Sequence, residues 1–165
     1  MLKADKTELK LNFPTLKGDF NGSGLRIAII CSTFNTKISK GLVEGALKGL
    51  KQAGLNDNDI SVALVPGAFE LASTAAKFAS NEDIDAVICL GCVIRGDTAH
   101  FDYVCQGATQ GITQVGIDYE LPVIFGVLTT DTLDQAIERA SDNDENKGLE
   151  AAQTAIQMAT LFKQI

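Results

Sequence analysis

Hydrophobic residues along the chain form runs of two kinds. In residues 25–31, 60–65, 86–94 and 123–128, apolar residues occupy successive positions, and these runs are rich in valine and isoleucine. Short uninterrupted runs of this kind, flanked by glycine, proline or polar turns, are typical of strands that are buried on both faces. The sequence therefore predicts four buried strands.

Between and after these runs, apolar residues recur with the spacing of an amphipathic helix. The first predicted helix has apolar residues at Ile38, Leu42, Ala46 and Leu50, and Gly54 follows it as a terminator. In all, the pattern predicts helices over residues 38–53, 68–79, about 101–119, 132–140 and 148–163.

The alternation of strands and helices predicts right-handed crossovers and a parallel sheet that helices cover on both faces. We therefore expect a single α/β domain over residues 1–165, a three-layer α/β/α sandwich with a four-stranded parallel sheet of the flavodoxin-like kind. Residues 1–22 are an N-terminal arm in this interpretation. The short alternating run at residues 9–13 is either an edge strand or a segment that pairs with the sheet of a neighbouring chain.

Charge and composition limit the partners. The chain has 165 residues, of which 45% are hydrophobic, and a formal net charge of −7. Nucleic acid or an anionic membrane surface would need a cationic face, so neither is expected as a partner, whereas a small anionic ligand needs only a local positive charge. The N-terminus shows no signal peptide, targeting leader or long apolar span, so we expect a cytoplasmic protein.

The four cysteines are Cys31, Cys89, Cys92 and Cys105. Cys89 and Cys92 have the CxxC spacing of some redox and zinc sites. However, Cys89 lies inside a predicted strand, and the sequence has no second CxxC or histidine pair that would complete a zinc site. We therefore interpret the cysteines as small buried hydrophobic residues in a reducing compartment.

Ligands of an open parallel sheet bind beyond the carboxyl ends of its strands. Residues 95–100, which follow the third predicted strand, include Gly96, Thr98 and His100. Glycine and a hydroxyl residue at the start of a helix present free N–H groups, so this segment predicts a phosphate cradle. His100 is the only histidine and can relay protons near neutral pH. A lone histidine is often only a surface or capping residue, but its place beside the cradle favours function.

Other candidates lie in the segments that follow the remaining strands. Gly67 permits close approach of a ligand to the backbone, and Glu70 either binds a polyol or complements a helix dipole. Phe34 either stacks on a flat heterocycle or packs on the next helix. Arg139 and Lys147 can bind phosphate, although each taken alone is more simply a surface ion pair.

These segments resemble the lumazine synthase family from about residue 25 to the C-terminus. The strongest motif is Gly91-Cys92-Val93-Ile94-Arg95-Gly96-Asp97-Thr98-Ala99-His100-Phe101-Asp102-Tyr103. The other motifs, in order around it, are Phe34-Asn35-Thr36-Lys37-Ile38, Val65-Pro66-Gly67-Ala68-Phe69-Glu70, the run from Pro122 to Thr130, Gln135-Ala136-Ile137-Glu138-Arg139-Ala140 and Asn146-Lys147-Gly148. Six motifs in the expected order and spacing make chance agreement negligible.

The resemblance implies a role for each matched residue. Phe34, in the first substrate loop with Asn35, would stack on a pyrimidinedione, and Val93 and Ile94 would line its pocket. The implied ribityl-binding residues are Gly67, Ala68 and Glu70, and the implied phosphate-binding residues are Gly96, Asp97, Thr98 and Arg139. His100 would relay protons. Phe125, Arg139 and Lys147 would reach the site from an adjacent subunit, because members of the family form pentamers, which many bacterial members stack into icosahedral shells.

The implied reaction condenses 5-amino-6-ribitylamino-uracil with 3,4-dihydroxy-2-butanone 4-phosphate to 6,7-dimethyl-8-ribityllumazine, the penultimate step of riboflavin biosynthesis. It needs no metal and no redox cofactor. In one segment the chain departs from the family pattern: Ser141-Asp142-Asn143-Asp144-Glu145 stands where many members have a Gly-Thr-Lys-x-Gly run. The added negative charge would weaken phosphate binding or alter how pentamers meet.

Three other functions are weighed against this one. The archaeal type of riboflavin synthase shares the architecture but lacks the Gly-Asp-Thr-x-His motif. A binding protein or shell-forming scaffold without turnover would not need His100, Arg139 and Phe34 together. A flavodoxin-like electron carrier would have a Ser/Thr/Gly-rich phosphate loop after the first strand, where this chain has Cys31-Ser32-Thr33-Phe34-Asn35. Tight flavin binding without turnover would favour the last two.

Overall fold

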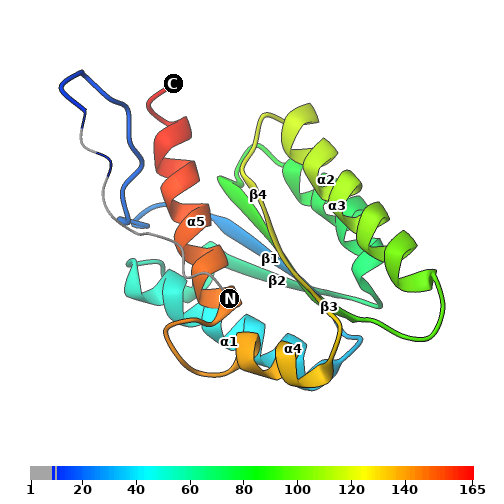
Figure 1. Ribbon diagram of the computed structural model, residues 1–165. Helices are drawn as coiled ribbons and strands as arrows, with labels where there is room; N and C mark the ends of the chain where they lie inside the picture. Colours follow the sequence, from blue (N-terminus) through cyan, green and yellow to red (C-terminus); the bar gives the residue numbers. More distant parts are fainter. Residues whose placement is uncertain (1–8, 10) are drawn as a thin grey trace.

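Four parallel strands form one sheet in a computed structural model that describes residue 9 and residues 11–165. The strands lie in the order β2-β1-β3-β4 (Figure 1). Their bounds are β1 (Ile27–Ser32), β2 (Ile60–Val65), β3 (Ala86–Ile94) and β4 (Val123–Thr130). The predicted four-stranded parallel sheet is confirmed.

Helices cover both faces of the sheet. One face carries α1 (Thr36–Gln52), α4 (Leu133–Ala140) and α5 (Lys147–Phe162), and the other carries α2 (Leu71–Ala79) and α3 (His100–Asp118) (Figure 1). Two short 3-10 helices, η1 (Asp57–Asp59) and η2 (Ala68–Glu70), precede β2 and α2. The three-layer α/β/α, flavodoxin-like architecture expected from the sequence is confirmed.

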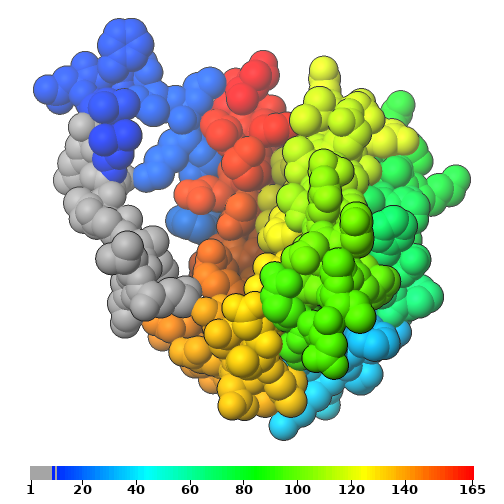
Figure 2. All heavy atoms as spheres, turned by 45° about the vertical axis from the view of Figure 1, so that its right-hand side comes forward, coloured from blue at the N-terminus to red at the C-terminus, as the bar shows by residue number. Residues whose placement is uncertain are grey.

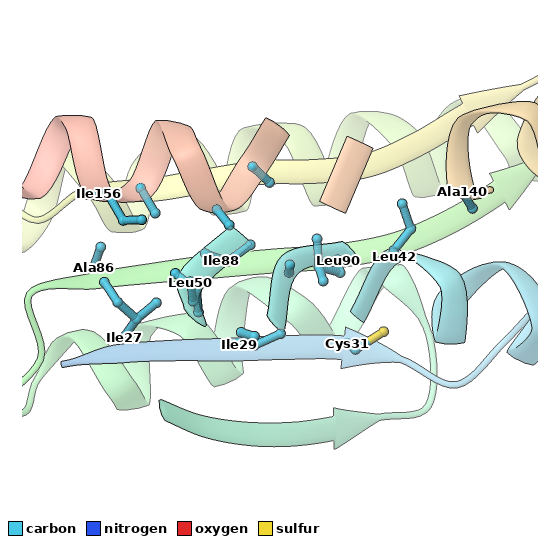
Figure 3. Close-up of a cluster of buried hydrophobic side chains, with 14 of the residues drawn as sticks. Ile27, Ile29, Cys31, Leu42, Leu50, Ala86, Ile88, Leu90, Ala140 and Ile156 are labelled. Atoms are coloured by element: carbon cyan, nitrogen blue, oxygen red, sulfur yellow. The ribbon is translucent and has the colours of Figure 1, made fainter. Parts of the chain in front are cut away.

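The two faces of the central strands build two separate cores, because successive side chains of a strand point to opposite faces. Ile29 and Ile88 pack with Leu42 and Leu50 of α1 and Ile156 of α5, as Figure 3 shows. On the other face, residues of alternate positions in β1 and β3 pack against α2 and α3. Each fully buried leucine or isoleucine stabilises the fold by about 1.5–3 kcal/mol, so these layers hold the ends of β1 and β3 in place.

The expectation that all four strands are fully buried is right for β1 and wrong for β2 and β4. Every residue of β1 is buried, whereas β2 exposes Val62 and Leu64, and β4 exposes Phe125. The reason is the strand order: β2 and β4 are the edges of the sheet, where the covering helices leave part of each strand open. An apolar run alone does not distinguish an edge strand from a central one.

The N-terminal segment packs against the last helix. The side chain of Thr160 in α5 accepts a hydrogen bond from the Asp19 backbone N–H at 2.9 Å, and the Gln164 amide donates to the Lys17 carbonyl at 2.8 Å. Residues 9 and 11–13 form no strand, and Lys10 lies outside the described residues. The structure of one chain therefore does not support the prediction that the run at residues 9–13 is an edge strand of its own sheet. Pairing of this run with a neighbouring chain stays a prediction, and the rest of the predicted arm at residues 1–8 is not described.

Three of the cysteines are buried in the sheet, as predicted. Burial raises the pKa of the Cys31 thiol to about 11, that of Cys89 to about 12 and that of Cys92 to about 11. Cys105, on α3, is half-buried. Because the thiolate is the reactive form, the buried thiols act as apolar side chains. No helix in the described part of the chain has the length and hydropathy needed to span a membrane.

Candidate functional site

A cavity of about 640 Å³ lies at the carboxyl ends of β1 and β3, bounded by η2 and the start of α3. Figure 2 shows this end of the molecule, where the start of α1 (cyan), the start of α3 (bright green) and α4 (yellow) gather. Most of the predicted site residues line this cavity: Phe34, Asn35, Gly67, Ala68, Glu70, Val93, Ile94, Gly96, Thr98 and His100. Asp97, between Gly96 and Thr98, is exposed but does not line the cavity.

Asn35 positions the aromatic side of the cavity. It precedes α1 in the left-handed conformation, with φ 59° and ψ 50°, and its amide Nδ2 donates to the Cys92 carbonyl of β3 at 3.0 Å. Asparagine tolerates this conformation better than most residues. The turn leaves the neighbouring Phe34 side chain 72% exposed, so its ring is available for stacking.

Replacing Asn35 separates these two contributions. We expect Asn35→Gly, which keeps the backbone conformation but loses the hydrogen bond, to lower the free energy of unfolding by about 1 kcal/mol. Asn35→Ala should lower it by about 1 kcal/mol more, because alanine disfavours a positive φ. Urea unfolding at one fixed protein concentration measures both. Equal stability of the two variants would contradict the conformational part.

Glu70 closes the turn after β2. Its Oε2 accepts a hydrogen bond from the Gly67 backbone N–H at 3.0 Å, so the carboxylate caps the 3-10 turn that leads into α2. The second oxygen, Oε1, accepts no hydrogen bond from the described residues, and Glu70 lines the cavity. The two interpretations of Glu70, capping and ligand binding, are therefore compatible.

The segment before α3 has the properties of an anion cradle. Within the described residues, the backbone N–H groups of Gly96, Asp97 and Thr98 donate to no backbone carbonyl, and a Cβ on Gly96 would meet no atom within 4 Å. The Thr98 hydroxyl accepts from the His100 N–H at 3.4 Å. His100 is exposed and is the first residue of α3, where free N–H groups and the helix dipole favour an anion.

Arg95 is the cation nearest to this cradle in sequence, but its charge is already engaged. Its guanidinium lies 3.2 Å from an Asp102 carboxylate oxygen and 3.0 Å from Asp131, and its Cζ stacks 4.1 Å from the centre of the Phe101 ring. The hydrogen bond to Asp102, followed by that to Asp131, raises the pKa of Arg95. Arg95 therefore ties the cradle to the turn after β4 and is not among the residues lining the cavity.

The remaining predicted residues line a second cavity, of about 490 Å³, which runs along β4. Phe125 lies in β4, Arg139 near the end of α4 and Lys147 at the start of α5. The Arg139 guanidinium donates to the Gln135 carbonyl at 2.8 Å, and the Lys147 ammonium lies 2.5 Å from a Glu150 carboxylate oxygen. The structure thus brings these two cations together but does not bring them to His100.

The two cavities differ in charge. The residues that line the first cavity include Gly96, Thr98 and His100 but no lysine or arginine, whereas Arg139 and Lys147 line the second.

A sequence model of the 6,7-dimethyl-8-ribityllumazine synthase family matches residues 24–163. The chain belongs to this family. The predicted resemblance to the lumazine synthase family is therefore confirmed, and with it a place among enzymes of riboflavin biosynthesis.

The lumazine synthase fold adds site residues that the sequence did not single out. Phe69, Phe101 and Tyr103 also line the first cavity and make it aromatic on more than one side. Phe69 can pack over α3 because Gly107 lies below it, where a Cβ would be 2.5 Å from the ring. Glu150 lines the second cavity. Glu150 lies three residues after Lys147 at the start of the predicted helix over residues 148–163, and this ion-pair spacing was the signal that could have revealed it.

Proposed function

We propose that the chain condenses 5-amino-6-ribitylamino-uracil with 3,4-dihydroxy-2-butanone 4-phosphate to give 6,7-dimethyl-8-ribityllumazine, phosphate and water. Family membership supports an enzyme of this kind. The observation that carries the proposal is that a cavity at the sheet edge combines an exposed aromatic ring, an anion cradle and the only histidine. Its volume, about 640 Å³, suits a heterocycle with a polyol side chain.

Each part of the first cavity suits one part of the substrates. Phe34 stacks on the pyrimidinedione, and Val93 and Ile94 line its pocket. Gly67, Ala68 and Glu70 hold the ribityl chain through backbone groups and the second carboxylate oxygen. Gly96, Asp97 and Thr98 offer backbone N–H groups to the phosphate, which leaves during the reaction.

The reaction requires orientation and proton transfer. The 5-amino group attacks the ketone, and loss of water gives a Schiff base. Removal of the proton from the hydroxyl-bearing carbon next to the imine expels phosphate and leaves an enol, which takes up a proton at its terminal carbon and becomes a new ketone. Attack of the ribitylamino nitrogen on this ketone, with loss of a second water, closes the ring. His100 accepts and returns protons in these steps, and the cradle stabilises the departing phosphate dianion.

The complete site forms between two copies of the chain. A phosphate dianion at the cradle needs a cation, and Arg139 and Lys147 lie in the other cavity. A neighbouring copy that brings its second cavity to this cradle would supply both cations, together with Phe125. We propose such self-association into pentamers, the assembly that the family resemblance implies, with a 60-subunit icosahedral shell as the further assembly that many bacterial members form. The expected cytoplasmic location stays a prediction.

The primary test follows product fluorescence when purified protein is mixed with the two substrates. We expect formation of the lumazine well above the uncatalysed background. Correctly folded, self-associated protein that binds flavin tightly but gives no acceleration would overturn the proposal and favour a binding protein or scaffold.

A second test addresses the shared site. His100→Ala and Arg139→Ala are each expected to be nearly inactive, but co-expression of the two should restore activity at about a quarter of the interfaces, where an intact cradle meets an intact cation pair. Mixed assemblies separated by two different affinity tags provide the sample, and assemblies of each variant alone are the controls. If mixed assemblies are no more active than either variant, both residues act within one copy.

A further inference from the structure

Asn146, between α4 and α5, has a buried side chain whose hydrogen-bonding groups are all used. It is 3% exposed. Its Oδ1 accepts from the backbone N–H groups of Gly148 at 2.8 Å and Leu149 at 3.1 Å. Its Nδ2 lies 3.0 Å from the carbonyls of Ala140 and Ser141 and 3.1 Å from that of Gly41. One amide therefore joins the end of α4, the start of α5 and the middle of α1.

Glycines leave this amide no room to move. A Cβ on Gly45 would lie 2.1 Å from Oδ1 of Asn146, and a Cβ on Gly41 would lie 2.3 Å from the Ala140 carbonyl oxygen. On the other side, a Cβ on Gly148 would lie 1.9 Å from the Leu42 carbonyl oxygen. The backbone of α1 therefore lies directly against this junction, and the position of Asn146 is fixed on both sides.

The two cations of the second cavity flank this junction. Arg139 immediately precedes Ala140, whose carbonyl accepts from Asn146, and Lys147 immediately follows Asn146 and begins α5. Apart from the bond to the Ser141 backbone carbonyl, the side-chain hydrogen bonds of Asn146 join groups outside the acidic segment 141–145. Both cation-bearing helix ends are thus held relative to α1, whatever residues fill the segment between them.

We infer that Asn146 is a positioning residue for phosphate binding: by joining α4, α5 and α1 it holds Arg139 and Lys147 at the spacing that a phosphate group requires. The inference rests on the proposed function, which assigns the two cations to the phosphate of the sugar substrate. A displacement of about 1 Å at such a site is enough to weaken binding or turnover strongly. The positioning role of Asn146 also explains how the chain keeps both cations in place although the acidic segment 141–145 lies beside the proposed phosphate site.

The informative substitution is Asn146→Ser. A serine hydroxyl can still accept from the first N–H groups of α5, because serine is as good a helix cap as asparagine. It is uncharged, so it adds no repulsion toward phosphate, and it is too short to donate to the carbonyls of Gly41 and Ala140. This variant therefore keeps the cap of α5 and removes the connection between the helices.

For Asn146→Ser we expect the KM for the sugar phosphate to rise about tenfold, with a similar rise in the inhibition constant of inorganic phosphate. The KM for the amino-uracil should change less than about twofold, because that substrate binds in the first cavity. Thr160→Ala is the matched control. It removes the hydrogen bond with Asp19 at the far end of α5, so it should lower the melting temperature without changing either KM.

A background with Arg139→Ala and Lys147→Ala separates positioning from general stability. In that background Asn146→Ser should change the phosphate inhibition constant no further, because the cations it positions are already gone. An unchanged KM for the sugar phosphate in Asn146→Ser, or an equal effect with and without the cations, would overturn the inference while wild-type turnover leaves the proposed function standing. Absence of turnover in the wild-type protein would overturn the proposed function and, with it, this inference.

Discussion

His100→Ala is expected to lower kcat by about a hundredfold to a thousandfold while leaving both KM values within a few-fold of the wild type. Proton transfer by a positioned side chain contributes about 10²–10⁴ to a rate, and His100 is the only histidine available for it. The backbone cradle and Phe34 remain in the variant, so orientation of the substrates survives. Steady-state kinetics with each substrate varied in turn measures the change.

Imidazole provides the control for this prediction. The first cavity is open enough to expose His100, so added imidazole can enter and carry protons in its place. We expect partial recovery of kcat in His100→Ala and no effect of imidazole on the wild type. A variant with wild-type kcat would mean that water or another side chain moves the protons.

The second large effect is on stability. Gly148→Ala is expected to lower the free energy of unfolding by about 3 kcal/mol, at the upper end of the usual cost of overpacking. The new Cβ would lie 1.9 Å from the Leu42 carbonyl oxygen, so α1 and α5 must move apart along their contact. For a chain of this length, thermal unfolding should show a fall in melting temperature of roughly 6–12 °C.

Gly116→Ala is the matched control for Gly148→Ala. Gly116 lies inside α3, and a Cβ there would meet its nearest neighbour, the Leu121 carbonyl oxygen, at an ordinary 3.4 Å. Since alanine favours a helix over glycine by about 1 kcal/mol, this variant should be as stable as the wild type or more so. Similar losses in both variants would mean that the close approach of α1 and α5 does not limit stability.

The layers and the parallel sheet could be predicted because their signal is periodic. Uninterrupted apolar runs and helical spacing depend only on local sequence, and alternation of the two leaves few topologies. The open edges at β2 and β4 could not be predicted this way, because the exposure of Val62, Leu64 and Phe125 depends on strand order, which the run itself does not contain.

The site was predictable where function depends on position in the fold, and less so where it depends on contacts between distant segments. The rule for sheet edges brought Phe34, Glu70 and His100 to one place, and they do line one cavity. The engagement of Arg95 by Asp131 and the junction at Asn146 depend on tertiary contacts. Of these contacts, the sequence indicates only one: an asparagine directly before a predicted helix is a candidate N-cap, which is the role of Asn146 at the start of α5.

The placement of the thiols limits how oxidative chemistry reaches this fold. Cys31, Cys89 and Cys92 are at most 2% exposed, and the desolvation that raises their pKa values keeps them as neutral thiols at neutral pH. Hydrogen peroxide or an electrophile that meets the native protein finds Cys105 far more accessible, on the helix that begins with His100. Damage at Cys31 and Cys89, which line neither cavity, therefore requires the sheet to open first, so modification of these two thiols reports past unfolding rather than exposure to an oxidant.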